Sequence, residues 1–142
     1  MKIALAADHG GFELKEIVKK SLEASDHEVI DVGCMTTDSV DYPDYAEKGV
    51  AKVISGECRF AILICGTGIG MSIAANRHRA IRAANCHEVY TAKMSREHND
   101  ANVLCLGARV IDADLALDII TNWLATDFGG GRHQRRIAKF SE

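Results

Sequence analysis

Residues 60–76 read FAILICGTGIGMSIAAN, and this stretch decides the fold. Its first six residues form a nearly unbroken apolar run that ends in closely spaced glycines, a pattern typical of a strand buried on both faces of a parallel sheet. Gly66, Gly68 and Gly70 allow a tight turn, after which residues 71–76 predict the start of a helix. The unpaired N–H groups of such a turn attract an anion. Because ligands of open α/β sheets bind at the carboxyl ends of the strands, we expect function here.

The rest of the chain alternates apolar strands with amphipathic helices. We expect further strands at residues 3–7, 28–32, 80–84 and 103–107, and helices at residues 12–24, 44–54 and 88–96. Leu115, Ile119, Trp123 and Leu124 mark the apolar stripe of a last, long helix. The first helix carries Lys15 among its polar residues, and the last ends near Asp127. Five strands in this alternation predict an α/β fold, a three-layer α/β/α sandwich with a five-stranded parallel sheet and one domain over residues 1–142.

The composition of the chain argues against several classes of function. With 142 residues, 47% of them hydrophobic, the chain fits one domain with a full core. Its net charge of -3 argues against a general binder of nucleic acid or membrane surfaces, so any anion site must be local. Five widely spaced cysteines without a CxxC pair favour reduced thiols over disulfides or zinc. No apolar run has the length of a signal peptide or a membrane span, and we expect a soluble, cytoplasmic protein.

The glycine turn fits neither of two nucleotide-binding loops. The dinucleotide fingerprint needs its third glycine where Met71 stands, and the NTPase phosphate loop needs a lysine that is absent after Gly70. A tight strand-to-helix turn without a ligand is the alternative.

Cys65 stands at the end of the central strand, beside the turn. A thiol near backbone N–H donors and a helix N-terminus can have its thiolate favoured, as a base or nucleophile requires. A packed, inert cysteine is the alternative, and we assign that role to Cys34, Cys58, Cys86 and Cys105. Thr67 could donate its hydroxyl to a substrate oxygen, or could simply bond to its own turn.

Two histidines follow predicted elements. His9 lies next to Asp8, and His98 next to Asn99. We expect both histidines at one sheet edge, where histidine suits proton transfer near neutral pH; surface histidines without function are the alternative. No cluster with ligand spacing predicts a metal site.

A basic segment closes the chain. Arg132 and Arg136 are four residues apart and share a face if the segment is helical, with His133 and Arg135 beside them. Guanidinium groups bind phosphate oxygens through paired hydrogen bonds, so this cluster suits a phosphate. A solvated basic tail is the alternative. Arg77, Arg79 and Arg82 receive no role.

Five motifs occur in one order: DHGGFELK, DYPDYA, ICGTGIGMSIAAN, SREHNDANVL and GGRHQRR. Together they resemble the ribose-5-phosphate isomerase B family of sugar-phosphate isomerases, over nearly the whole chain. The resemblance implies a Rossmann-like fold and an aldose–ketose isomerase that needs neither metal nor cofactor. It also implies a homodimer or homotetramer with active sites between two subunits.

The resemblance implies roles for particular residues. Cys65 would be the base, and Thr67 would hold the enediolate oxygen together with N–H groups of the turn, at Gly66, Gly68, Ile69 and Gly70. Asp8 and His98 would open the sugar ring, with Asn99 nearby. The phosphate would be held by His9, Arg109, Arg132 and Arg136. Which subunit supplies His98, Asn99 and Arg109 stays open.

The expected reaction is the interconversion of D-ribose 5-phosphate and D-ribulose 5-phosphate, a step of the pentose phosphate pathway. Some relatives carry a carboxylate base near the position of Ile69; the apolar residue here favours Cys65 instead. Three alternatives remain. These are an isomerase of a six-carbon sugar phosphate such as allose 6-phosphate, a binding module without chemistry, and a cysteine hydrolase or transferase that uses Cys65 with His98.

Overall fold

The computed structural model describes residues 1–141, which contain five strands and six helices. The strands are β1 (Lys2–Ala7), β2 (Glu28–Gly33), β3 (Phe60–Cys65), β4 (Ala83–Asn85) and β5 (Val103–Gly107). The helices are α1 (Phe12–Ala24), α2 (Tyr42–Ile54), α3 (Ile69–Ala75), α4 (Val89–Asn99), α5 (Ala113–Ala125) and α6 (Arg132–Ile137). All strand pairs are parallel, in the order β2-β1-β3-β5-β4. The α/β class and the parallel sheet predicted from the sequence are confirmed.

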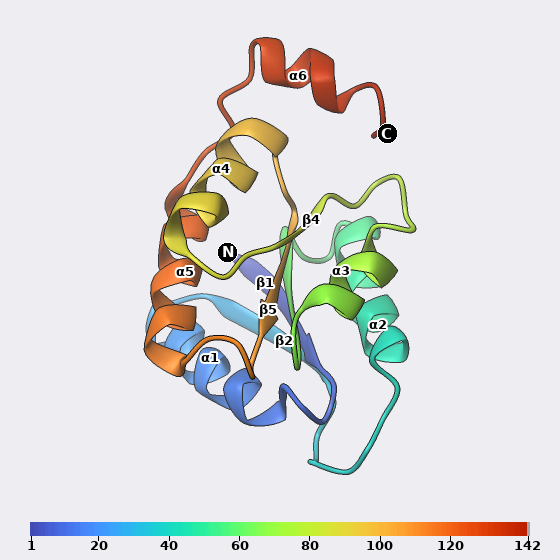
Figure 1. Ribbon diagram of the computed structural model, residues 1–142, viewed down its shortest axis with the longest axis vertical. Helices are drawn as coiled ribbons and strands as arrows, with labels where there is room; N and C mark the ends of the chain where they lie inside the picture. The colour runs from blue at the N-terminus through green and yellow to red at the C-terminus, as the bar shows by residue number, and fades with distance from the viewer. Residues whose placement is uncertain (142) are drawn as a thin grey trace.

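Two apolar layers flank the sheet. On one face α1, α4 and α5 pack against it, and Trp123 lies fully buried with its ring 4.7 Å from that of Phe60. On the other face α2 and α3 cover a smaller cluster around Leu63 and Met71. Figure 1 shows the two helical layers on either side of the strands. Every residue of β3 is buried, as its unbroken apolar sequence predicts for a strand covered on both faces.

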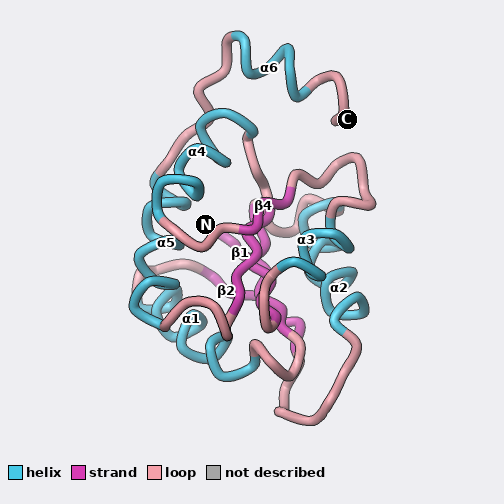
Figure 2. The backbone as a smooth tube through the Cα atoms, viewed as in Figure 1, coloured by secondary structure: helices cyan, strands magenta, loops and turns pink. Residues whose placement is uncertain are grey.

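Helix α6 lies beyond the sandwich, at the end of the molecule where α4 ends (Figure 2). The Gly129 N–H donates to the Glu97 carbonyl at 2.8 Å, which ties the approach of α6 to α4. Ile137 is the buried residue of α6, and its arginines are exposed. None of the helices in residues 1–141 combines the length and apolar content needed to cross a lipid bilayer.

Four expected boundaries were wrong. Strand β4 covers residues 83–85 rather than 80–84, because Asn102 Oδ1 takes the Arg82 N–H just before the strand begins. The Asn76 side chain bonds both backbone groups of Ala83 at the open edge of β4. Helix α2 begins two residues early, since Pro43 fits a first helical turn. Helix α3 also begins two residues early, at the end of the glycine turn. Helix α4 continues three residues past residue 96.

Lys15, one of the polar residues of the first predicted helix, lies on the buried side of α1. Its side chain is fully buried and forms ion pairs with Asp31 on β2 and with Glu16. A buried charge is tolerated when it is paired and hydrogen-bonded, which these contacts provide. The pair joins α1, which begins at the turn after β1, to the neighbouring strand.

Candidate active site

Cys65 ends β3 and faces the glycine turn. Its side chain is almost fully buried, and the Gly68 N–H donates to Sγ at 3.1 Å. Gly68 adopts the left-handed conformation, with φ +80°, and α3 begins at the next residue. A backbone N–H that donates to sulfur gives a reacting thiol a fixed hydrogen-bond partner. The structure therefore gives Cys65 the setting that a base requires.

Thr67 bonds to its own turn, which is the alternative that the sequence left open. Its Oγ1 accepts the Ile69 N–H at 3.2 Å. The hydroxyl hydrogen can still be donated, because this contact uses only the oxygen as an acceptor.

Gly70 lies in the first turn of α3, where an added Cβ would stand 2.6 Å from the ring of Tyr42. Tyr42 belongs to the DYPDYA motif but received no role from the sequence, because its contact with the turn depends on how α2 packs.

The turn after β1 lies directly against the end of β3. Asp8 Oδ1 accepts the N–H groups of Gly10 and Gly11, at 2.9 and 3.2 Å, so its carboxylate shapes the turn. A Cβ on Gly11 would lie only 2.5 Å from the Ile64 carbonyl oxygen, so this position has room for glycine alone. The Asp8 side chain is thereby fixed one strand away from Cys65.

His9, in the same turn, is fixed by a neighbouring loop. Its Nδ1 accepts the Val40 N–H at 3.2 Å, from the segment that precedes α2. A nitrogen that accepts carries no proton, so neutral His9 has its proton on Nε2. His9 is therefore arranged as a donor through Nε2.

Arg109 links the two turns within one chain. Its backbone N–H donates to the Gly66 carbonyl at 3.0 Å. Its guanidinium lies against both turns, since a Cβ on Gly66 would stand 3.1 Å from Nη1 and a Cβ on Gly10 would stand 3.4 Å from Nη2. Beside it is an open hollow of about 360 Å³ whose lining includes Gly10 and Asp112. Arg109 thus lies at the same strand edge as Cys65 within one chain.

Two residues that the sequence did not indicate also contact the glycine turn. Asn85 ends β4 and His87 follows it, and both donate to the Thr67 carbonyl oxygen, at 3.4 and 3.1 Å. Both stand at the carboxyl end of a strand, but in the sequence they look like ordinary polar residues of a loop. Their contact with the turn arises because β4 lies beside β5 in the sheet, and the sequence alone does not reveal this strand order.

His98 and Asn99 do not lie at this edge, and the expectation of one shared edge for His9 and His98 was wrong. They belong to the last turn of α4, which runs back toward the amino ends of the strands. There the His98 ring stacks on that of His133, with centroids 4.3 Å apart and planes 15° apart. Arg132 and Arg136 lie on the same α6 segment as His133. The candidate residues therefore form two groups at opposite ends of one chain.

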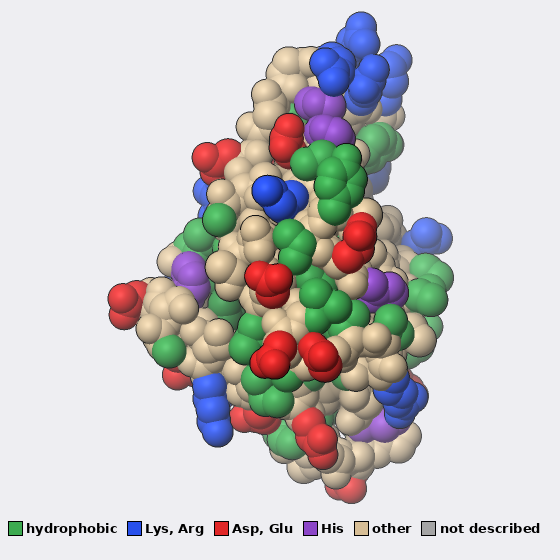
Figure 3. All heavy atoms as spheres, turned by 60° about the vertical axis from the view of Figure 1, so that its left-hand side comes forward, with side chains coloured by type: hydrophobic (Ala, Val, Ile, Leu, Met, Phe, Trp, Pro, Cys, Tyr) green, Lys and Arg blue, Asp and Glu red, His purple; other side chains and the backbone are tan. Residues whose placement is uncertain are grey.

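The second group is strongly basic. Figure 3 shows Lys and Arg side chains gathered at the end formed by α6, with histidines next to them. Loss of hydration lowers the pKa of His133, and the charges of His98, Arg132 and Arg136 lower it further. A cluster of positive side chains attracts an anion. This cluster has the character of a phosphate site.

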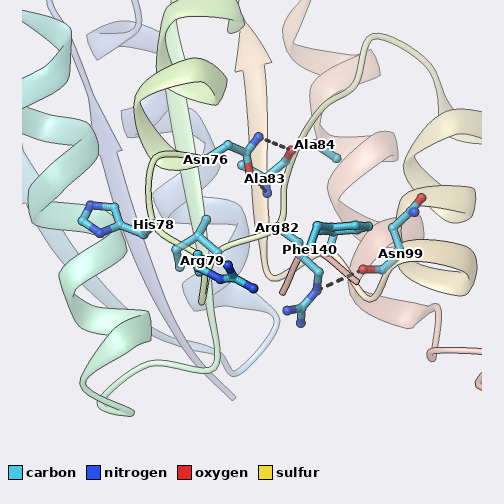
Figure 4. A pocket seen from close by; sticks show the side chains of 10 residues that line it. Asn76, His78, Arg79, Arg82, Ala83, Ala84, Asn99 and Phe140 are labelled. Carbon is cyan, nitrogen blue, oxygen red and sulfur yellow. Dashed lines mark hydrogen bonds between the residues drawn. The ribbon is translucent and has the colours of Figure 1, made fainter. Parts of the chain in front are cut away.

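A hollow of about 420 Å³ lies next to the basic group, and Asn99, Arg79, Arg82 and Phe140 are among its lining residues (Figure 4). Its lining does not include Cys65. Arg82 Nε donates to the Asn99 carbonyl at 3.1 Å and Nη1 donates to Ser141 Oγ at 2.7 Å. Arg82, which received no role from the sequence, thus joins the end of α4 to the C-terminal segment.

The two groups supply complementary chemistry. The first offers a thiol with aligned donors, suited to moving a proton beside a carbonyl, and the second offers cations for a phosphate. Within residues 1–141, no three His, Cys, Asp or Glu side chains gather as metal ligands do.

Comparisons with known proteins agree with this chemistry. The model of a family described as Ribose/Galactose Isomerase matches residues 3–140. Ribose-5-phosphate isomerase B of Escherichia coli is 48% identical over 136 residues, which cover 96% of this chain and 91% of the relative. The solved ribose-5-phosphate isomerase B of Clostridium thermocellum is 54% identical, with a TM-score of 0.97, and the match covers 98% of this chain and 94% of that one.

A third match carries a bound sugar phosphate. The ribose-5-phosphate isomerase B of Mycoplasma genitalium, solved with ribulose 5-phosphate, is 39% identical with a TM-score of 0.93. The match covers 97% of this chain and 92% of that one. A family model that spans nearly the whole chain, a thiol at the glycine turn and a basic phosphate-type cluster lead to one conclusion: this chain belongs to the ribose/galactose isomerase family.

Proposed function

We propose that this chain interconverts ribose 5-phosphate and ribulose 5-phosphate, by moving a proton between C1 and C2 of the open sugar. The observation that carries the proposal is the contact of 3.1 Å between Cys65 Sγ and the Gly68 N–H, at the carboxyl edge of a sheet of this family. The similarity to a relative that binds ribulose 5-phosphate supports the choice of a five-carbon sugar.

Cys65 acts as the base in this reaction. A C–H next to a carbonyl is a weak acid, so its removal needs a placed base and fixed dipoles where the oxyanion develops. The thiolate takes the proton from C2 of the aldose; the C–H electron pair becomes the C1=C2 double bond, and the π pair of the carbonyl moves to O1 to give an enediolate. The proton of the C2 hydroxyl then passes to O1. Return of the first proton to C1, with the C=O bond re-formed at C2, gives the ketose. The Thr67 hydroxyl, which the Ile69 N–H holds in place, and the N–H groups of Gly66 and Gly70 stabilise the oxyanion.

A complete site needs two copies of the chain. The thiol and the basic group lie at opposite ends of the chain, while a sugar phosphate must reach both. In a two-fold dimer, each copy can lay its α4–α6 end over the strand edge of the other, which produces two equal sites. We infer a homodimer, or a tetramer made of such dimers. Each site combines the edge of one copy with His98, Asn99, Arg132 and Arg136 of its partner.

The remaining roles follow from this arrangement. Asp8 of one copy and His98 of the partner exchange protons with the ring oxygen and the anomeric hydroxyl as the ring opens. The phosphate is held by Arg132 and Arg136 of the partner, together with His9 and Arg109. Anchoring this remote group places C1 and C2 at the thiol, so that binding energy is used for orientation.

Mixed dimers test the shared site. Cys65→Ala and His98→Ala chains with different tags are co-expressed, and the mixed species is purified. Each parent should be inactive, whereas the mixed dimer has one site with both residues intact and should recover about half of the activity of the unmodified dimer. A dimer whose sites lie within single chains would recover none, which would refute the arrangement.

Direct assays test the reaction and its substrate. Purified protein with a metal chelator should form ribulose 5-phosphate from ribose 5-phosphate. Turnover of allose 6-phosphate with a higher kcat/KM would instead favour a six-carbon substrate. The family description, Ribose/Galactose Isomerase, also names a six-carbon sugar. Binding of both sugars without turnover would indicate a binding module.

A further inference from the structure

The peptide group between Thr67 and Gly68 is bonded on both of its sides. Its N–H donates to Cys65 Sγ, and its carbonyl oxygen accepts from Asn85 Nδ2 and His87 Nε2, at 3.4 and 3.1 Å. A trans peptide is a rigid plane whose N–H and C=O point in opposite directions. Fixing the carbonyl therefore also fixes the direction of the N–H that reaches the sulfur.

The two side chains can act only as donors here. A carbonyl oxygen has no hydrogen to give, so His87 must carry a proton on Nε2 and Asn85 must turn its NH₂ group toward Thr67. Hydrogen bonds in a chain polarise one another, so donation to the carbonyl strengthens the N–H as a donor to sulfur. The Thr67–Gly68 peptide thus transmits polarisation from β4 to Cys65.

The remaining atom of the Asn85 amide supports a dedicated role. Its Oδ1 is buried and has no hydrogen-bond partner among residues 1–141. This oxygen faces Gly68, where an added Cβ would overlap it. An unpaired buried oxygen destabilises a fold, so the amide is not there to increase stability. The hydrogen bond that the Asn85 amide makes is the one from Nδ2 to the Thr67 carbonyl oxygen.

We propose that Asn85 and His87 are positioning residues that hold the Thr67–Gly68 peptide, so that its N–H stays directed at Cys65 and keeps the thiol reactive. Neither residue touches the substrate in this role. The proposal rests on the proposed function only in that Cys65 is taken as the base.

The test compares variants that remove or keep the donors. Asn85→Leu/His87→Leu removes both donors, His87→Leu removes one, and His87→Gln keeps an N–H at the same site. Three quantities are measured: the rate of Cys65 alkylation by iodoacetamide near neutral pH, the Gly68 amide proton shift by NMR, and kcat with KM. Cys65→Ser versions of each variant give the background from the other thiols.

We expect the double variant to lose about 10-fold in alkylation rate and in kcat, with KM nearly unchanged, and to shift the Gly68 amide proton upfield. His87→Leu should lose less, and His87→Gln should restore the values of the unmodified protein. An unchanged alkylation rate and Gly68 shift in folded His87→Leu and double variants would overturn the proposal. If the double variant fails to fold, the His87→Leu and His87→Gln pair decides alone.

The outcome is separable from the proposed function. Alkylation and the amide shift report on the peptide and the thiol even in a protein without turnover. Full turnover of Cys65→Ser would refute Cys65 as the base while leaving these two measurements intact.

Discussion

Lys15 Nζ lies 2.6 Å from Asp31 Oδ2, with the lysine side chain fully buried and the aspartate nearly so. Removing one member of such a pair leaves an unpaired buried charge. We expect Lys15→Met to lower the free energy of unfolding by about 3 kcal/mol, measured by urea denaturation. Lys15→Met/Asp31→Asn removes both charges and keeps an acceptor for the Gly33 N–H. It should be more stable than the single variant, and the reverse order would contradict this account.

The same pair predicts how stability depends on pH. Burial alone would lower the pKa of Lys15 and raise that of Asp31, but the bonds and charges between them outweigh burial. The Lys15 pKa is therefore raised above 10.5 and the Asp31 pKa lowered below 3.8. The Lys15 contribution is complete below 10.5 and is lost as the pH rises through its folded value; the Asp31 contribution is complete above 3.8 and is lost as the pH falls. The double variant should show a flatter profile at both extremes, and parallel profiles would argue against the pair.

Cys65→Ala should abolish turnover and keep the fold. General bases contribute on the order of 10²- to 10⁴-fold, so kcat should fall by about that factor. The loss of one buried sulfur should cost only about 1 kcal/mol of stability. Cys58→Ala is the matched control, since Cys58 is equally buried but precedes β3. It should lose similar stability and retain kcat; a similar kcat for the two variants would contradict the role of Cys65.

Gly68→Ala tests the shape of the turn. Alanine at φ +80° is strained, and its Cβ would also overlap Asn85 Oδ1. Gly56 has nearly the same φ, +81°, with nothing near its Cβ position, so Gly56→Ala measures the backbone cost alone, about 1 kcal/mol. We expect Gly68→Ala to lose more stability than this and to lower kcat, by thermal unfolding and assay. Equal stability losses would mean that the turn can relax around the methyl group.

The arginines of α6 should govern substrate affinity. Charge-assisted hydrogen bonds contribute about 1.5–3 kcal/mol, so Arg132→Ala or Arg136→Ala should raise KM for ribose 5-phosphate by about 10- to 100-fold. The effect should shrink for an unphosphorylated sugar. Arg135→Ala, a neighbour on the same exposed helix, is the control. An equal rise in KM for Arg135→Ala would point to general attraction rather than direct contacts.

Much of the fold is predictable because burial leaves a plain signature in the sequence. The apolar run of β3 and the glycines after it predict a central strand and its turn, and the structure confirms both. The single-domain organisation over residues 1–142 stays a prediction. Strand β4 was misplaced because the Asn102 side chain takes the Arg82 N–H, just before the strand begins. Such side-chain contacts join residues far apart in the sequence and leave no periodic pattern.

The candidate site is predictable only in part, for a geometric reason. Cys65, Asp8 and Arg109 follow strands, so the sequence indicates their shared edge. His98 was wrongly assigned to that edge: it precedes a strand rather than following one, and a helix that leads into a parallel strand ends at the amino side of the sheet. Asn85 and His87 were missed because their partner is the carbonyl of a residue about twenty positions away.

The separation of the Cys65 turn from the α6 end also bears on how such a protein can change over evolutionary time. The two regions pack independently, one within the sheet layers and the other through Ile137 and the Gly129 contact with α4. Substitutions that reshape the cationic end leave the thiol and its donors untouched. If the proposed roles hold, phosphate affinity can therefore change within this family while the groups that transfer the proton stay the same.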